Sequence, residues 1–226
     1  MKDNFTFTTK GLIKKINEDS IGIRVSEDLT RVCVCDGHWG KEAALQAKKD
    51  CLLIKNFPTN SRAALSLING IQMKLFKRFG RLKMKPEKDF TPETSLLTVE
   101  LSKNNELRII SYGDCRLMVT RQGKIIFKIK TINTWLGAFS FLGLRNRITV
   151  KKATIFKKIV CQSGDLIWIF TDGVDECIYE KPTISLKWLA KTGLQDDDLK
   201  KIINIVMGEI RRLGAEDNAS IAIIKC

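Results

Sequence analysis

This 226-residue chain has one histidine, His38, no C-x-x-C pair among its seven cysteines, and no long run of apolar residues. A single histidine excludes every metal site that needs several imidazole ligands. Any bound metal must then be held mainly by oxygen, which favours Mg²⁺ or Mn²⁺ over zinc. The apolar runs reach about half a dozen residues, whereas a helix that crosses a bilayer needs about 20. We therefore expect no membrane span.

The seven cysteines allow two interpretations, a disulfide or zinc framework and a set of reduced, buried thiols. Their number is odd and most of them lie within apolar segments, which favours buried thiols in a cytoplasmic protein. The first residues also lack the apolar core of a secretory signal. Both observations predict a cytoplasmic location.

The formal net charge of +14, from 39 basic and 25 acidic side chains, raises the hypothesis of nucleic-acid binding. The basic residues are spread along the chain, however, and no zinc-finger, basic-zipper or RNA-recognition signature is present. This distribution favours a solvated basic surface, so we expect no nucleic-acid partner. The length and the hydrophobic fraction of 44% predict one folded domain over residues 1–226, which we expect to be a monomer.

Hydrophobic periodicity predicts an α+β domain built of layers. Apolar runs and period-two alternation predict strands at residues 4–8, 21–25, 31–35, 95–101, 107–112, 116–121, 124–130, 165–170 and 220–224. Apolar stripes at helical spacing predict helices at residues 41–56, 61–79 and 196–213. Asn104-Asn105 and Gln122-Gly123 predict hairpin turns.

The predicted strands repeatedly end or begin at acidic residues. These acids are Glu18-Asp19, Asp36, Asp114, Asp172 and Asp217. One Asp-Gly after a strand is an ordinary turn signal, but five acidic positions on buried strands are harder to explain in that way. If the strand ends converge, the carboxylates need a compensating positive charge, which divalent cations with oxygen ligands supply. The pattern thus raises the hypothesis of an oxygen-ligated metal site.

Six short segments resemble, in the same order, the motifs of the metal-dependent (type 2C) serine/threonine protein phosphatases. They are GLIKKINED at 11–19, VCDGHWG at 34–40, Thr94-Ser95, SYGDCR at 111–116, FTDGVDE at 170–176 and EDNAS at 216–220. The matches span residues 8 to 225. The resemblance implies a four-layer αββα sandwich, in which two antiparallel β-sheets are flanked by helices.

The resemblance also implies a binuclear Mg²⁺ or Mn²⁺ centre. Asp36 would bridge both ions, with Asp172 and Asp217 completing the first site. Glu18 and the carbonyl of Gly37 would serve the second site, and Asp19 would hold a coordinated water. Asp114 and Asp172 match the position of a weaker third ion. The ions would generate a bridging hydroxide that attacks phosphoserine or phosphothreonine in a protein substrate.

Two further residues are catalytic candidates by the same resemblance. His38 matches the residue that protonates the leaving oxygen, and Lys14 stands where the family has a phosphate-binding arginine. Lysine keeps the charge but loses the planar bidentate fork, so we expect weaker or differently oriented phosphate binding. Trp39 replaces a glycine, and we expect the local backbone to differ there. Only 58 positions separate Asp114 from Asp172, which predicts a reduced flap at residues 131–158.

These observations favour a metal-dependent protein phosphatase. A catalytically weak relative that binds phosphoproteins as a regulator is the second hypothesis, because of the departures at Lys14 and Trp39. A basic nucleic-acid-binding domain is the third.

Overall fold

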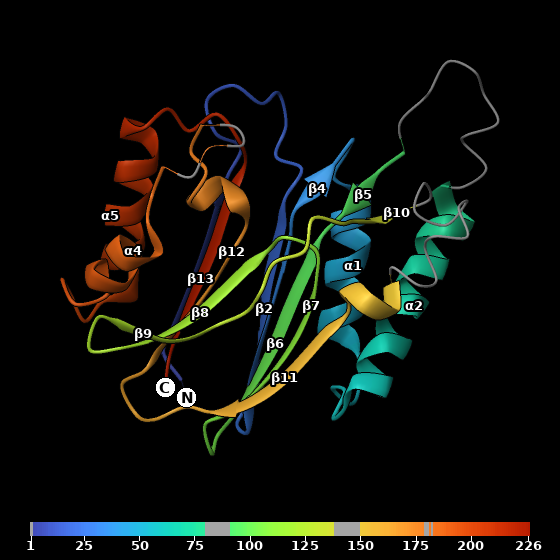
Figure 1. Cartoon of the computed structure of the whole chain (residues 1–226), viewed down its shortest axis with the longest axis horizontal. Helices are drawn as coiled ribbons and strands as arrows, with labels where there is room; N and C mark the ends of the chain where they lie inside the picture. The colour runs from blue at the N-terminus through green and yellow to red at the C-terminus, as the bar shows by residue number, and fades with distance from the viewer. Residues whose placement is uncertain (1, 80–90, 138–149, 179–180, 182) are drawn as a thin grey trace.

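Two five-stranded antiparallel sheets face each other in the computed structural model of the chain (Figure 1). The structure describes residues 2–79, 91–137, 150–178, 181 and 183–226. The first sheet has the strand order β1-β13-β12-β8-β9. Its strands are β1 (Asn4–Thr9), β13 (Ala219–Lys225), β12 (Leu166–Phe170), β8 (Arg116–Arg121) and β9 (Lys124–Lys128).

The second sheet has the strand order β11-β7-β6-β3-β2. Its strands are β11 (Ile155–Val160), β7 (Glu106–Tyr112), β6 (Leu96–Ser102), β3 (Leu29–Cys35) and β2 (Ser20–Val25). A small third sheet joins β10 (Leu136–Gly137), β5 (Glu93–Thr94) and β4 (Gly37–His38) beside the ends of these strands.

Helices cover the outer face of each sheet (Figure 1). α1 (Glu42–Leu53) and α2 (Ser61–Phe79) pack on the second sheet, whereas α4 (Leu186–Thr192) and α5 (Leu199–Arg212) lie on the first. α5 begins after Asp198, whose carboxylate accepts a hydrogen bond from the amide of Lys200 at 2.8 Å and caps the helix.

Three apolar clusters separate these layers. The middle cluster fills the space between the sheets with strand residues such as Val32, Val99, Ile167 and Ile224. The other two lie under α1 and α2 and under α4 and α5. The αββα sandwich implied by the motifs is therefore confirmed.

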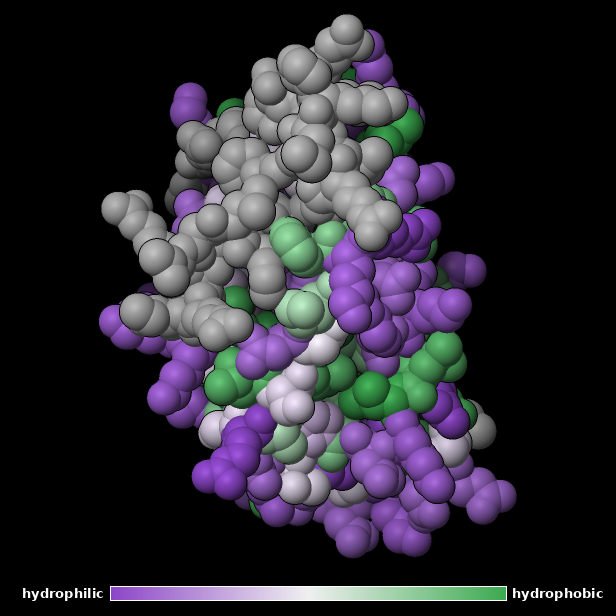
Figure 2. All heavy atoms as spheres, turned by 90° about the vertical axis from the view of Figure 1, so that its right-hand side faces the viewer, coloured by the Kyte–Doolittle hydropathy of each residue, from purple (hydrophilic) through white to green (hydrophobic). Residues whose placement is uncertain are grey.

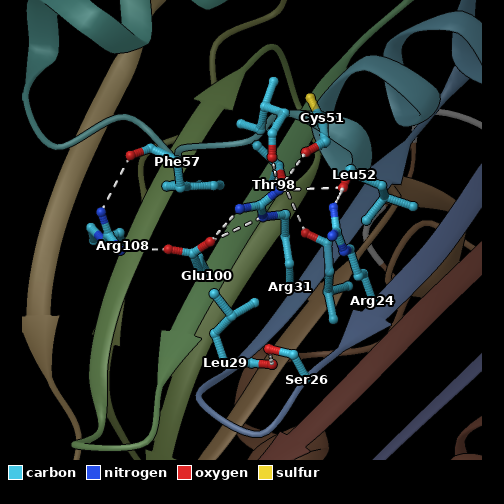
Figure 3. Close-up of polar contacts among 12 residues, drawn as sticks. Arg24, Ser26, Leu29, Arg31, Cys51, Leu52, Phe57, Thr98, Glu100 and Arg108 are labelled. Carbon is cyan, nitrogen blue, oxygen red and sulfur yellow. Dashed lines mark hydrogen bonds and ion pairs between the residues drawn. The ribbon is translucent and has the colours of Figure 1, made fainter.

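Two charged residues, Arg31 and Glu100, are buried between the end of α1 and the second sheet, and the partly exposed Arg108 extends the network (Figure 3). Arg31, Glu100 and Arg108 stand opposite one another on β3, β6 and β7, and Glu100 pairs with both arginines. Arg31 also donates to the carbonyl oxygens of Leu52 and Ile54 at 3.3 and 2.7 Å, at the end of α1. This network ties the helix to the sheet.

Most predicted elements are confirmed to within a few residues, with three corrections. The first helix ends at Leu53 rather than at residue 56, and the last begins at Leu199 rather than at residue 196. Residues 155–158 of the predicted flap belong to strand β11, while residues 138–149 lie outside the described part of the chain. α4, β11 and the small third sheet were not predicted.

Both predicted turns adopt the left-handed backbone that such turns need, with φ of 61° at Asn105 and 48° at Gln122. All seven thiols are free, and every one except that of Cys226 is buried. No helix among the described residues is long and apolar enough to cross a membrane. Figure 2 shows the face at the right-hand side of Figure 1, where hydrophilic residues cover most of the coloured surface.

Candidate metal centre

Three of the predicted acids converge at one end of the two facing sheets. Asp36 follows β3, Asp114 follows β7, and Asp172 opens the short 3₁₀ helix η3 (Asp172–Val174) after β12. One carboxylate oxygen from each residue lies within 4.8 Å of the others. The ends of strands from both sheets thus bring these three acids to a single point.

Electrostatics at this point favour a bound cation. Burial raises the pKa of Asp36 well above its usual range, and the nearby carboxylate of Asp172 adds to the shift. Burial and the neighbouring Asp114 likewise raise the pKa of Asp172 to about 8. Asp36 Oδ2 and Asp114 Oδ1 are buried and accept no hydrogen bond from the described residues. Buried carboxylate oxygens without donors fit Mg²⁺ or Mn²⁺, which prefer oxygen ligands.

Asp19 lies buried beside this triad, at the start of β2. Its Oδ2 accepts a hydrogen bond from Thr171 Oγ1 at 2.9 Å, while its Oδ1 has no partner among the described residues. Burial raises the pKa of Asp19 to about 7, and the charge of Asp217 adds to this shift. Asp19 is therefore part of the same charge cluster and has an oxygen free for a further ligand.

Glu18 and Asp217 lie next to the triad but are held by a lysine. Lys14 Nζ is 3.0 Å from Asp217 Oδ1 and 3.9 Å from Glu18 Oε2. The backbone amide of Gly40 donates to Glu18 Oε1 at 2.5 Å. Burial lowers the pKa of Lys14, but the hydrogen bond to Asp217 and the surrounding carboxylates outweigh it and raise the pKa above its usual value. Lys14 is thus a cation inside the acidic cluster.

A cavity of about 420 Å³ opens over the acids and includes His38, Trp135, Asp114, Asp172 and Asp217 in its lining. The rings of His38 and Trp135 meet edge to face, with 5.0 Å between their centroids. His38 Nδ1 is buried and has no hydrogen-bond partner among the described residues. Burial lowers the pKa of His38, whereas the charges of Asp114 and Asp217 act in the opposite direction.

The backbone is constrained at Gly37 and Trp39, the residues on either side of His38. Gly37, in β4, packs so closely on the chain at Glu18 that an added Cβ would overlap the Glu18 carbonyl oxygen. Trp39, which stands where the resembled motif has glycine, has φ of 61°. This left-handed conformation is uncommon and strained for a bulky residue.

Arg116 lies at the site and was not predicted from the sequence. It pairs with Glu176, its Nε lies 2.9 Å from Asp175 Oδ2, and its Nη1 donates to the carbonyl oxygen of Asp114 at 3.2 Å. Arg116 thereby links the loop that carries Asp114 to the segment that follows Asp172. The only sequence signal for Arg116 was its position two residues after Asp114, in the SYGDCR segment.

The amide side chain of Asn218 was also missed. Its Nδ2 donates to the carbonyl oxygens of Lys10 and Ile16 at 2.9 and 3.1 Å, and its Oδ1 accepts from the Glu18 amide at 2.9 Å. A single side chain therefore holds both ends of the loop that carries Lys14. These contacts join segments about 200 residues apart, and local sequence patterns do not reveal them.

The fold is similar to that of a class of solved structures, the bacterial serine/threonine phosphatases. One crystal structure of a bacterial serine phosphatase, which bears a single arginine-to-alanine mutation, matches with a TM-score of 0.77 at 14% sequence identity. The match covers 100% of this chain and 98% of the other. The resemblance predicted from the motifs is thus confirmed at the level of the fold.

Two further structures of the class are informative. The phosphatase Stp1 from Staphylococcus aureus matches with a TM-score of 0.75 and 14% identity, over 100% of this chain and 95% of its own. The catalytic domain of the phosphatase PstP, solved in complex with two manganese ions, matches with a TM-score of 0.72 and 14% identity, over 99% and 97% of the two chains. No family model matches the sequence. No curated protein matches it either.

Proposed function

We propose that this chain is a metal-dependent phosphatase that hydrolyses phosphoserine and phosphothreonine in proteins. The observation that carries the proposal is the convergence of Asp36, Asp114 and Asp172 within 4.8 Å, with buried oxygens that lack hydrogen-bond donors. The fold shared with the serine/threonine phosphatases supports this reading. The manganese ions of PstP and the magnesium of RsbX, a further structure of similar fold, support divalent cations as the cofactors.

The acids divide into two groups in this proposal. Asp36, Asp114 and Asp172 would hold one ion, and Asp19 would place its unpartnered oxygen beside them. Glu18, Gly37 and Asp217 would help to hold a second ion once Lys14 has released Asp217. When bound, such ions lower the pKa of a water, which makes it a nucleophile at neutral pH, and stabilise charge on the phosphate.

Lys14 and His38 act on the substrate. Once Lys14 has released Asp217, its ammonium binds a phosphate oxygen, which replaces one anionic partner by another. His38 supplies a proton to the leaving serine or threonine oxygen. Its unpartnered Nδ1 and its edge-to-face contact with Trp135 support this role, because the ring is held in place and a nitrogen is free for a ligand.

Turnover of a phosphothreonine peptide by the purified chain with Mn²⁺ tests the proposal. We expect EDTA and Asp36→Asn each to abolish phosphate release. Asp28→Asn is the matched control, since Asp28 lies in an exposed pair with Lys103, and it should leave the rate unchanged. Turnover that survives EDTA, or that Asp36→Asn leaves intact, would refute the mechanism.

A regulatory phosphoprotein-binding role is the alternative that one observation favours. Lys14 holds Asp217 at 3.0 Å, and a lysine that keeps this acid would weaken the second ion site. Titration of Mn²⁺ by calorimetry separates the two readings. Two binding events at micromolar to submillimolar concentration support the enzyme, whereas no binding below millimolar Mn²⁺ supports the scaffold. We further propose a single domain in a reducing, cytoplasmic setting, which the free thiols support.

A further inference from the structure

The loop that carries Lys14 presents apolar side chains to solvent at the edge of the candidate site. Leu12, Ile13 and Ile16 are 67%, 67% and 50% exposed. The loop borders the cavity because Lys14 contacts Asp217, one of the residues that line it. Three large aliphatic side chains are therefore exposed beside the acids rather than buried in a core.

This loop is fixed in place and is not a loosely held segment. The Asn218 side chain binds the carbonyl oxygens of Lys10 and Ile16 at its two ends, and the amide of Leu12 donates to the Ala215 carbonyl oxygen at 2.8 Å. Gly11, with φ of 72°, packs so closely on Ala215 and Asp217 that no Cβ would fit. The backbone is thus ordered while its apolar side chains remain uncovered, as in a pre-organised binding surface.

Trp39 adds an aromatic surface on the cavity side. Its side chain is 55% exposed, it lines the cavity, and its φ of 61° is a conformation that bulky residues avoid. Strained residues of this kind gather at functional sites. Glu18 connects the loop to the residue after Trp39, because it contacts both Lys14 and the amide of Gly40.

We propose that Leu12, Ile13, Ile16 and Trp39, called here the apolar rim, bind apolar side chains next to the phosphorylated residue of a protein substrate. The proposal rests on the proposed function. A small phosphate ester has no side chains to fill this surface, whereas an extended peptide whose phosphate lies in the cavity places its flanking residues on the rim. Exposed Lys10 and Lys15 stand within the same loop and complement the negative charge of such a peptide.

Binding of two fluorescently labelled phosphothreonine peptides of equal charge tests the rim. One peptide carries leucine and valine on both sides of the phosphothreonine, and the other carries serine and glycine there. With EDTA present, so that neither peptide is hydrolysed, we expect the apolar peptide to bind the unmodified chain about tenfold more tightly by fluorescence anisotropy. The double variant Leu12→Ser, Ile13→Ser should reduce this preference to about twofold or less.

A matched control keeps the result specific. Leu53 and Val160 are 62% and 71% exposed, at positions away from the strand ends that carry the acids, and Leu53→Ser, Val160→Ser should keep the full preference. Circular dichroism of each variant establishes that it is folded. Equal affinity of the unmodified chain for both peptides, or a preference that the rim variant keeps, overturns the inference. The inference is also overturned if the unmodified chain sediments as a dimer and only the rim variant sediments as a monomer, because the rim would then bind a second copy.

Failure of the rim and failure of the proposed function give different results. Hydrolysis of p-nitrophenyl phosphate needs the metals and the catalytic residues but no flanking side chains. If this activity is present and the peptide preference is absent, the rim inference alone is wrong. If neither peptide nor ester is hydrolysed while the peptide preference in binding persists, the catalytic proposal is wrong and the rim serves a binding protein.

Discussion

Replacement of Glu100 by glutamine tests the buried charge network between α1 and the second sheet (Figure 3). Glu100 is the only carboxylate that pairs with Arg31 among the described residues, and both side chains are buried. Glutamine keeps the shape but leaves the Arg31 guanidinium without an anion. Breaking a buried pair from one side costs about 3–5 kcal/mol. Typical stabilities are about 5–15 kcal/mol, so this loss is a large share of the total.

Thermal unfolding followed by circular dichroism measures the effect. For a chain of about 150–250 residues, 1 kcal/mol corresponds to about 2–4 °C in Tm, and we expect Tm to fall by roughly 6–20 °C. Adding Arg31→Met should recover part of the loss, because the unpaired charge is then removed. Asp28→Asn, which breaks an exposed pair with Lys103, should leave Tm unchanged. A decrease in Tm of less than about 2 °C for Glu100→Gln would refute the reasoning.

Three further predictions concern the site. In EDTA, Tm should decrease as the pH rises from about 4 to about 8 and level off above that, because Asp19 and Asp172 have pKa values raised from 3.8 to about 7 and about 8 and the folded state binds more protons than the unfolded chain over this range. Mn²⁺ should suppress this dependence in scanning calorimetry, and a flat profile in EDTA would contradict the burial of these acids. Lys14→Ala should raise KM for a phosphopeptide about 10-fold or more, as loss of a charged hydrogen bond implies, and steady-state kinetics with an unchanged KM would exclude phosphate binding by Lys14. Trp39→Gly should be more stable in urea than Trp39→Ala by about 1 kcal/mol, since φ is positive there; the opposite order would show that the backbone relaxes.

The elements with a clear hydrophobic period were predictable from the sequence. α2 and α5 present apolar stripes to the sheets, and the central strands β3, β6 and β12 are buried on both faces. β11 was missed because it is an edge strand with exposed lysines. α4, with seven residues, and the two-residue strands β4, β5 and β10 are too short to show a period.

The positions of the acids in the candidate site were predictable because each acid lies within two residues of the start or end of a strand. Their partners were not. Arg31 and Glu100 face each other only through the register of β3 and β6, which the sequence leaves open until the sheet is known. In the same way Lys14 meets Asp217 only because Asn218 holds their two segments together. Contacts that depend on packing of distant segments leave no local pattern.

The pairing of β1 with β13 and the contacts of Asn218 also set the order in which the site can form during synthesis. Asn218 holds the Glu18 loop from a position 200 residues further along the chain. At about 5–20 residues per second, a ribosome needs roughly 10–40 s to make the intervening segment. During that interval Glu18 and Asp19 have neither Asn218 nor Asp217 to contact. A nascent chain is therefore expected to hold Mn²⁺ in this geometry only after β13 has left the ribosome, and metal binding would report the completion of folding.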